Sequence, residues 1–237
     1  MLTIFTHNGK KKMNHKILAA VEKMLQTSPQ LLRNKKLLQQ AIVGTFDVWV
    51  DNVAFHNIGE LVEKIDDKIL ERYFGEVWQP EMKKFKYSGL SLIDEINSLH
   101  PRSVLDIGCG YNEFRGKIKN LTGLDPYNKN ADVQCKLLEY YPSERYDVVM
   151  ALGSINFGSV DKVFAELERA VELTEPKGKL FFRVNPGLAH TPPESEWISF
   201  YPWNSNFIIN CANYFDVDVL DIKHDHKNRM YFVWSKK

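Results

Sequence analysis

The stretch that decides the fold is Val104-Leu-Asp-Ile-Gly-Cys-Gly110, an apolar run that stops at two closely spaced glycines. The apolar run is typical of a buried strand, and glycine lets the backbone after it turn tightly and approach a ligand. Asp125 follows 19 residues after Asp106, at the end of the next apolar run. A strand, a glycine turn, a short helix, a second strand and an acidic residue predict a nucleotide-type cofactor at the carboxyl edge of a sheet.

The same alternation continues to the end of the chain. Seven runs are predicted as strands, at residues 103–108, 121–125, 131–135, 146–152, 179–184, 215–222 and 230–235. Helices are predicted at 90–99, 160–173 and 203–214, and Pro176-Lys-Gly178 is expected to form a turn. Strands joined by crossovers predict an α/β fold with a doubly wound, mostly parallel seven-stranded sheet. The last two runs predict a hairpin that gives this sheet an antiparallel edge strand.

The first 87 residues have helical periodicity instead. We therefore expect two parts, a helical N-terminal cap or lid at 1–87 and a Rossmann-like domain at 88–237. Ser28-Pro29 is predicted to open a helix and Gly44 to interrupt it. Asn57 and Glu60 have capping-box spacing, and Gly75 is expected to close the helix that they open. The aromatic series of Trp49, Phe55 and Trp78 is predicted to pack the cap rather than to form a stacking platform.

Composition excludes several classes of protein. The 237 residues are 44% hydrophobic and 26% charged, which is typical of a globular protein and not of a disordered or fibrous one. No apolar run of 18 residues is present, so we expect no membrane span. The three cysteines, Cys109, Cys135 and Cys211, form no CxxC pair, which predicts a reducing compartment, a cytoplasmic location and no structural zinc.

Charge is distributed unevenly along the chain. Residues 1–36 hold eight basic side chains and one acidic side chain, a net charge of +7, whereas the whole chain is +1. The rest of the chain must therefore carry −6. A basic end is compatible with an anionic partner such as a nucleic acid, although a solvated lysine surface is the simpler interpretation.

The residues around the glycine turn favour one cofactor. A dinucleotide site would have a third glycine at position 113, which is Glu here, and the Asp106 carboxylate would repel a pyrophosphate. A carboxylate suits a cationic group such as the amino group of a methionine moiety. The sequence therefore predicts S-adenosylmethionine rather than NAD.

Several stretches together carry a resemblance to a known family. They are 106–110, Leu124-Asp-Pro126, Tyr146-Asp-Val-Val149 and Pro176-x-Gly178 before a strand. Residues 88–237 resemble the class I S-adenosylmethionine-dependent methyltransferases, whose antiparallel last strand the terminal hairpin would match. The stretches 106–112, 151–158 and 183–187 are also similar to small methyltransferases carried by marine tailed phages.

The resemblance implies roles for individual residues. Around the methionine moiety and the ribose it places Asp106, Gly108, Cys109, Gly110 and Asp125. Around the adenine it places Pro126, Tyr127, Cys135 and Lys136, although the family more often has an acidic residue after the third strand. The loop from Ala151 and Leu152 to Asn156 would face the sulfonium and the substrate. Asn112 stands where a third glycine is usual, and Asn tolerates a positive φ.

Candidates for catalysis lie in two loops. Ser154 and Asn156 are expected either to face the substrate or to cap the helix that begins near Val160. The loop 185–203 holds Asn185, His190, Glu194 and Glu196, of which His190 has the pKa best suited to a general base. Cys109 is expected to be a packed side chain and not a nucleophile. His224, Asp225 and His226 are assigned to a solvated turn, so no metal site is predicted.

Three functions follow as hypotheses. The first is methyl transfer to a small molecule, with the helical region excluding water. The second is methylation of a nucleic acid or a protein held by the basic N-terminus. The third is a non-catalytic S-adenosylmethionine-binding module. The sequence does not specify the oligomeric state.

Overall fold

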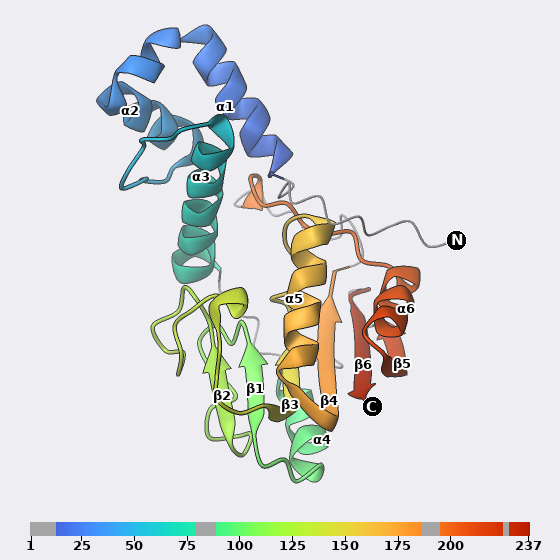
Figure 1. The fold of residues 1–237 in the computed structure, drawn as a ribbon. Coiled ribbons are helices and arrows are strands. Elements are labelled where there is room, and N and C mark those ends of the chain that lie inside the picture. The colour runs from blue at the N-terminus through green and yellow to red at the C-terminus, as the bar shows by residue number, and fades with distance from the viewer. Residues whose placement is uncertain (1–12, 79–88, 186–194, 225–227) are drawn as a thin grey trace.

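The computed structural model describes residues 13–78, 89–185, 195–224 and 228–237. It has an α/β body and a helical cap above the carboxyl ends of the parallel strands (Figure 1). The predicted boundary between residues 87 and 88 lies outside the described residues. Within the described part, no helix combines the length and the apolar character needed to cross a bilayer.

The body is built on one mixed sheet. Its six strands, in the order β2-β1-β3-β4-β6-β5, are β1 (Val104–Ile107), β2 (Leu121–Leu124), β3 (Tyr146–Ala151), β4 (Thr174–Val184), β5 (Val217–His224) and β6 (Met230–Lys236). The first four are parallel, and β6 pairs antiparallel with both β4 and β5. The predicted fold class, a mostly parallel sheet with an antiparallel edge, is confirmed.

Alternate residues of the central strands bury opposite faces of this sheet. Leu105, Val149 and Phe182 belong to a core with α5 (Val160–Glu172) and α6 (Ser205–Tyr214). Val104, Val148 and Phe181 belong to a second core with η3 (Gly89–Leu92) and α4 (Ile93–Ser98). Because both faces are covered, these strands read as continuous apolar runs in the sequence.

The strand count differs from the prediction of seven. Residues 131–135 form only an isolated bridge, between Val133 and Leu124. The Asp132 carboxylate accepts a hydrogen bond from the Gly123 backbone N–H (2.8 Å). This N–H of β2 is therefore bonded to a side chain and not to the backbone of a further strand. A short 3-10 helix, η4 (Leu137–Glu139), follows.

The short helix expected between β1 and β2 is also wrong. Residues 110–120 form turns, in which Asn112, Gly116 and Asn120 have φ of 57°, 75° and 56°. Left-handed residues at this spacing interrupt a right-handed helix. Similarly, residues 176–178 lie inside β4 as an irregularity with Lys177 at φ 65°, instead of forming a turn before the strand.

The cap consists of α1 (His15–Thr27), η1 (Pro29–Arg33), α2 (Lys35–Phe46), α3 (Ile58–Arg72) and the π-helix η2 (Tyr73–Val77). Its own apolar core includes Ile17, Ile42 and Ile65. The core extends to Ile198, which lies in the segment after β4. Asn14 strengthens this junction, because its Nδ2 donates to Asp66 Oδ1 and to the Trp197 carbonyl, both at 2.8 Å.

Several boundary predictions in the cap are corrected. Ser28 caps only the 3-10 helix, without a side-chain hydrogen bond, whereas Asn34 caps α2. Gly44 lies inside α2, and Gly75 lies inside η2 rather than closing α3. The N-cap is confirmed at Asn57, whose Oδ1 accepts from the Glu60 N–H (3.0 Å), but the Glu60 carboxylate accepts from the His56 N–H (2.8 Å) and not from that of Asn57 as a capping box requires.

The aromatic prediction for the cap holds at one position. Phe55 packs against the cap core, as predicted. Trp49 is 64% exposed and so does not pack the cap. Trp78 lies against Gly110 of the body, where its ring is 3.2 Å from the position that a Cβ on Gly110 would occupy.

Candidate functional site

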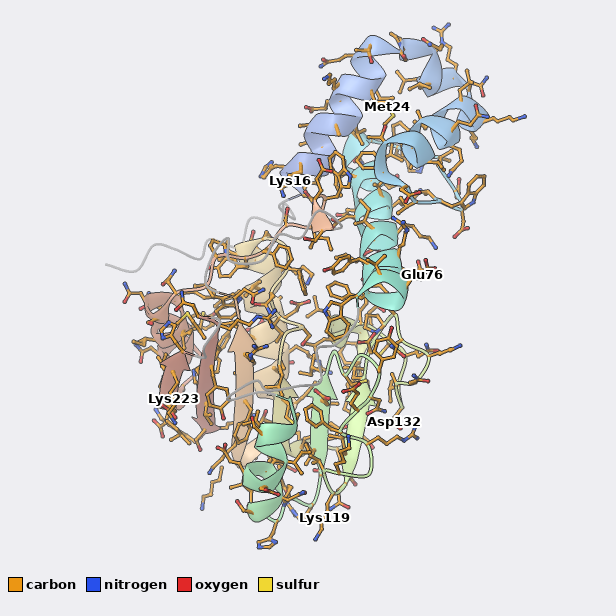
Figure 2. All side chains as sticks on the ribbon, turned by 180° about the vertical axis from the view of Figure 1, so that it is seen from behind. Lys16, Met24, Glu76, Lys119, Asp132 and Lys223 are labelled. Atoms are coloured by element: carbon orange, nitrogen blue, oxygen red, sulfur yellow. The ribbon has the colours of Figure 1, made fainter. Side chains whose placement is uncertain are left out.

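The candidate site lies where β1, β2 and β3 end, beneath the lower end of the cap. Figure 2 shows that end of the cap, marked by Glu76, above the strands that run upward toward it. The Gly108 and Cys109 N–H groups donate to the Leu124 carbonyl (2.7 and 3.1 Å), which fixes the turn to the end of β2. Gly108 and Gly110 have φ of 68° and 55°, the left-handed conformation that favours glycine.

Gly108 is required for packing as well as for conformation. A Cβ at this position would lie 2.2 Å from the Ser154 Cβ, which is closer than real Cβ atoms approach. Ser154 itself donates from Oγ to the Ile107 carbonyl (2.5 Å). The glycine turn after β1 and the loop after β3 therefore fit together only because position 108 has no side chain.

Asp106 is an unpartnered acidic group at the end of β1. It is 3% exposed, and among the described residues no hydrogen bond reaches its carboxylate. Burial, and secondarily the charge of Asp125, raise the pKa of Asp106 to about 7. A buried carboxylate without a partner is costly, so this position favours a cationic ligand.

Asp125, the acidic neighbour of Asp106, accepts three backbone hydrogen bonds. Its Oδ1 accepts from the N–H groups of Tyr127 (2.8 Å) and Asn128 (2.9 Å), and its Oδ2 accepts from the Gly110 N–H (3.0 Å). A carboxylate has about four acceptor positions. Asp125 therefore joins the glycine turn to the turn after β2 and retains one acceptor position for a ligand.

Cys109 lies between these two acids in the glycine turn. Burial raises the pKa of its thiol, and the charges of Asp106, Asp125 and Asp132 raise it further. A thiol that stays protonated is a poor nucleophile. The raised pKa is consistent with the expectation that Cys109 is no nucleophile, whereas its packed role stays a prediction, because the side chain is half-buried and belongs to none of the three apolar cores of the described residues.

Two of the residues assigned to the adenine, Tyr127 and Lys136, contact the cap. Tyr127 stacks on Phe74 of η2, with ring centroids 6.3 Å apart and planes 14° from parallel. The Lys136 ammonium donates to both oxygens of Asp67 on α3 (2.8 and 2.9 Å). Cys135 is half-buried against the main core, and Pro126 is half-buried in the turn after β2. Lys136 thus links the body to the cap.

Asn112 takes over the position of the usual third glycine. It is 5% exposed at φ 57°, and its Nδ2 donates to the Asn130 carbonyl (3.1 Å) and to Asp132 Oδ2 (3.0 Å). Its amide lies within 2.8 Å of where a Cβ on Gly123 would be. Asp132 was not singled out by sequence, because its role depends on a contact across the turn.

The loop after β3 holds two of the predicted catalytic residues. Asn156 is 2% exposed; its Nδ2 donates to the Gly153 carbonyl (2.9 Å), and its Oδ1 accepts from the Asn185 N–H (2.8 Å). Ser159 caps α5 by accepting from the Lys162 N–H (3.3 Å), so neither Ser154 nor Asn156 has that role. Asn156 holds the ends of two strands together, whereas Ser154 borders the glycine turn.

The remaining loop candidates are dispersed or lie outside the described part of the chain. His190 and Glu194 are outside the described residues. Asn185 is 4% exposed at the end of β4, and Glu196 accepts a hydrogen bond from Lys16 Nζ through its backbone carbonyl (2.9 Å). Ala151 is buried and Leu152 half-buried at the end of β3. In the described part of the chain, no three His, Cys, Asp or Glu side chains cluster closely enough to hold a metal ion.

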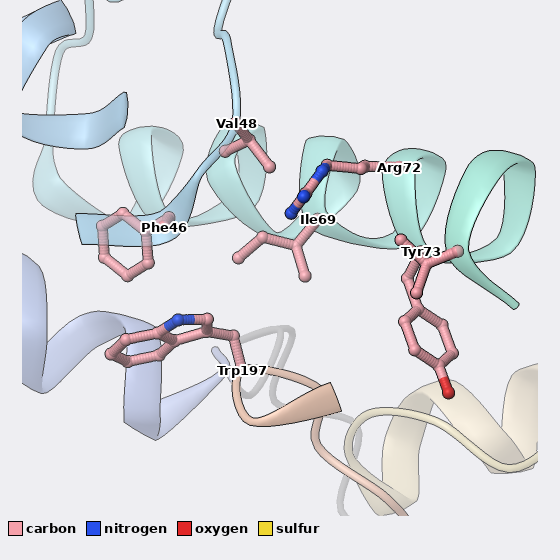
Figure 3. Close-up of a pocket in the computed structure, with 7 residues that line it drawn as sticks. Phe46, Val48, Ile69, Arg72, Tyr73 and Trp197 are labelled. Atoms are coloured by element: carbon pink, nitrogen blue, oxygen red, sulfur yellow. The ribbon is translucent and has the colours of Figure 1, made fainter. Parts of the chain in front are cut away.

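A small cavity of about 40 Å³ lies between the cap and Trp197, and none of the predicted site residues lines it. Figure 3 shows Trp197 beneath Phe46 and Ile69, with Arg72 above them. Trp197 meets Phe46 edge to face, with centroids 4.8 Å apart, and Arg72 pairs with Asp47 of the cap. Such a volume accommodates water molecules and not a nucleoside. The glycine turn therefore remains the candidate site.

The fold described above, a mostly parallel α/β sheet with an antiparallel edge, is also found in solved structures of methyltransferases. No protein-family model and no curated protein sequence matches the chain. Among solved structures, it is similar to a 1,6-didemethyltoxoflavin-N1-methyltransferase from Burkholderia thailandensis with bound 1,6-didemethyltoxoflavin and S-adenosylhomocysteine. That likeness has a TM-score of 0.57 at 14% identity and covers 80% of this chain and 95% of the other.

Two weaker likenesses have TM-scores of 0.49. The N-methyltransferase NodS from Bradyrhizobium japonicum, in complex with S-adenosylhomocysteine, is 12% identical and covers 70% of this chain and 96% of its own. An O-methyltransferase family protein from Burkholderia thailandensis is 13% identical and covers 94% of this chain and 72% of its own. None of these three is described as a phage protein, so the phage likeness stays a prediction.

Proposed function

We propose that this protein is an S-adenosylmethionine-dependent methyltransferase that acts on a small molecule. The observation that carries the proposal is the buried Asp106 carboxylate beside the glycine turn, which no hydrogen bond from the described part of the chain reaches. A carboxylate there suits the ammonium of the methionine moiety, and an exposed Gly108 leaves the backbone open to a ligand. The shared fold supports this assignment, and the neighbouring N1-methyltransferase holds S-adenosylhomocysteine.

In this proposal Asp125 receives the ribose. Its one remaining acceptor position takes one hydroxyl, and the second hydroxyl replaces the 3.0 Å bond from the Gly110 N–H. Tyr127 and Pro126 border the adenine, with Cys135 and Lys136 at its edge. Since Lys136 is paired with Asp67, the adenine amine would be recognised by backbone groups and not by the Lys136 side chain.

The chemistry requires mainly alignment. The cofactor supplies a methyl group already activated by the positive sulfur, and the acceptor's lone pair displaces the thioether in line. Correct orientation alone is worth about 7–11 kcal/mol. A base is needed only where the acceptor must lose a proton, and His190 is our candidate for that step. Ser154, whose Oγ donates to the Ile107 carbonyl beside the glycine turn, would border the reacting groups, whereas Asn156 supports the loop.

The size of the methyl acceptor is inferred from the part of the cap that covers the site. The lower end of the cap places Phe74 against Tyr127 and Trp78 against Gly110, so the cap covers the carboxyl edge of the sheet. A site that is covered by the cap excludes water and favours a small molecule over a polymer as the methyl acceptor. The named acceptor of the neighbouring Burkholderia enzyme, 1,6-didemethyltoxoflavin, is consistent with that class.

Cofactor binding tests the proposal. We expect isothermal titration calorimetry to show that the wild-type protein binds S-adenosylhomocysteine. Asp125→Ala should lower this affinity at least about tenfold, because the ribose loses its hydrogen-bond acceptor. Thermal unfolding of the variant is the control, since Asp125 also orders two turns. A folded variant with unchanged affinity would contradict the ribose assignment.

Two other functions keep their own tests. For methylation of a nucleic acid, the net charge of +7 in residues 1–36 predicts binding that weakens steeply with salt, and deletion of residues 1–16 should flatten that slope. A non-catalytic module would bind the cofactor without turnover. Incubating the protein with labelled S-adenosylmethionine and fractionated cell extract distinguishes the small-molecule enzyme, the nucleic-acid enzyme and the non-catalytic module. Only a catalyst transfers the label, and the fraction that becomes labelled identifies the class of acceptor. A cytoplasmic location remains part of the proposal.

A further inference from the structure

Asn185 has a buried side-chain amide that takes part in no hydrogen bond with the described residues. The residue is 4% exposed, and its Oδ1 is out of contact with solvent and has no hydrogen-bond donor. A buried amide carbonyl without a donor destabilises a folded protein, because the group has lost its bonds to water and formed none to protein. The amide at position 185 therefore calls for an explanation beyond packing.

Asp106 is the other buried polar side chain in the described part of the chain that has no hydrogen bond. Each of the remaining ones has a hydrogen bond or another interaction of its own. Asp106 lies in β1 and Asn185 follows directly after β4, and both strands belong to the parallel part of the sheet. Because ligands of such sheets bind at the carboxyl ends of the strands, both groups lie where a ligand is expected.

The backbone of Asn185 is held on both sides. Its N–H donates to Asn156 Oδ1 (2.8 Å), and its carbonyl accepts from the Trp203 N–H (3.3 Å). Asn156 in turn donates from Nδ2 to the Gly153 carbonyl (2.9 Å), so the end of β4 is tied to the loop after β3. A side chain on a backbone that is fixed in this way can hold a ligand group in one orientation.

Asn185 lies on the side of the proposed site that is left for the methyl acceptor. The cofactor residues Asp106 and Asp125 belong to the ends of β1 and β2, and β3 lies between β1 and β4 (Figure 1). Since neighbouring strands are about 4.8 Å apart, β4 is about 10 Å from β1. The loop that holds Ser154 against Gly108 borders the space between them. An acceptor in contact with Asn185 would therefore lie beside the cofactor and not on top of it.

A structural role does not account for the amide. The contacts that fix Asn185 are made by its backbone, which any residue except proline supplies. Asn156 shows the structural alternative, because both ends of its amide bond to backbone groups. At position 185 an apolar side chain of the same size would avoid the unpaired carbonyl, so the amide has a use that the ligand-free protein does not show.

We propose that Asn185 binds the methyl acceptor by accepting a hydrogen bond at Oδ1 from an uncharged N–H or O–H group. This inference rests on the proposed function and specifies its substrate class. A carboxylate or a phosphate would bring oxygen against oxygen, and an acceptor without a donor would leave the carbonyl unpaired, so both are disfavoured. Asn185 thus determines specificity for the acceptor, whereas Asp106 and Asp125 bind the cofactor.

The first part of the test compares Asn185→Leu with Asn156→Leu in the full-length, ligand-free protein. Leucine keeps the size of asparagine but cannot form hydrogen bonds. Asn185→Leu should unfold at the same denaturant concentration as the wild type or at a higher one, because no hydrogen bond of the side chain is lost. Asn156→Leu is the matched control and should unfold at a lower concentration, because it loses two. An equal loss in Asn185→Leu would make its amide structural and overturn the inference.

The second part measures methyl transfer from labelled S-adenosylmethionine to the extract fraction that the wild type labels. Asn185→Leu should need about tenfold more of this fraction for half-maximal transfer, while its affinity for S-adenosylhomocysteine stays within about twofold of the wild type. Unchanged half-saturation, or an equal loss of S-adenosylhomocysteine affinity, would overturn the inference. Failure of the wild type to label any fraction contradicts the proposed function itself, whereas transfer that Asn185→Leu leaves unchanged contradicts only the role of Asn185.

Discussion

At the scale of single residues, the buried Asp106 carboxylate makes the stability of the folded protein depend on pH. Its pKa is about 7 in the folded protein and near 3.8 when unfolded, so the folded state favours the protonated form. The stabilising contribution is full below pH 4 and is lost as the pH rises to 7, a change of up to about 4 kcal/mol. The ligand-free protein should therefore become less stable across this interval.

Asp106→Asn separates the effect of this carboxylate on stability from its proposed role in cofactor binding. At pH 8 we expect denaturant unfolding to show that the ligand-free variant is more stable than the wild type, because the buried charge is gone. Calorimetry should show weaker binding of S-adenosylhomocysteine by the variant. The wild-type affinity should fall about tenfold per pH unit below pH 7, since binding the ammonium requires an ionised carboxylate, and the variant should lose this dependence. A variant less stable at pH 8 would contradict the assignment.

Gly108 offers a second residue-scale prediction. Gly108→Ala should lower the free energy of unfolding by about 2–5 kcal/mol, combining the cost of a left-handed alanine with the overlap at Ser154. Gly116→Ala is the matched control, because Gly116 has φ 75° but nothing lies within 4 Å of the position that its Cβ would occupy. That control should lose only about 1–2 kcal/mol in denaturant unfolding. Equal losses would mean that Ser154 moves aside freely.

At the scale of elements, the N-terminus of α1 has a role beyond capping. Asn14 accepts from the Lys16 N–H (3.2 Å) and Ser199 Oγ (3.1 Å) while it donates to Asp66 and Trp197. Asn14→Ala should destabilise the protein by about 2–4 kcal/mol, because a cap and buried hydrogen bonds are lost together. Asn34→Ala, which removes only the local cap of α2, should cost about 1 kcal/mol in the same thermal or denaturant unfolding. A similar loss in both variants would contradict the linking role of Asn14.

The elements predicted best from sequence were those whose pattern is local. α5, α6 and the hairpin of β5 and β6 have strong apolar periodicity or clear turns, and they form close to their predicted positions. The helix ends were less predictable, because Asn34 and Ser159 compete with other plausible caps nearby. The helix predicted after Gly110 does not form because Asn112 and Asn120 adopt the left-handed conformation. Contacts such as that of Asn112 with Asp132 stabilise this conformation, and they cannot be read from the local sequence.

At the scale of the whole molecule, sequence predicted the layers but not how the two parts meet. The glycine turn, Asp106 and Asp125 were recognisable because their spacing follows from strand order. Phe74 was not singled out, because its ring contacts with Tyr127 and Phe157 join segments that are far apart in the sequence. Asn156 was assigned to catalysis because the sequence cannot show that both ends of its amide bond to backbone groups.

The edge of the sheet at β2, where the predicted seventh strand is only an isolated bridge, affects self-association in solution. Beyond β2, the Asp132 carboxylate already occupies the Gly123 N–H, and Arg115 pairs with the same carboxylate (2.8 Å). A free row of donors and acceptors would recruit an extended segment from another molecule. The backbone of Asp132 and Val133 also pairs with Gly123 and Asp125 along this edge. Since these groups are taken, addition of a strand from another molecule at β2 is disfavoured, and the protein should tolerate high concentration without associating along β2.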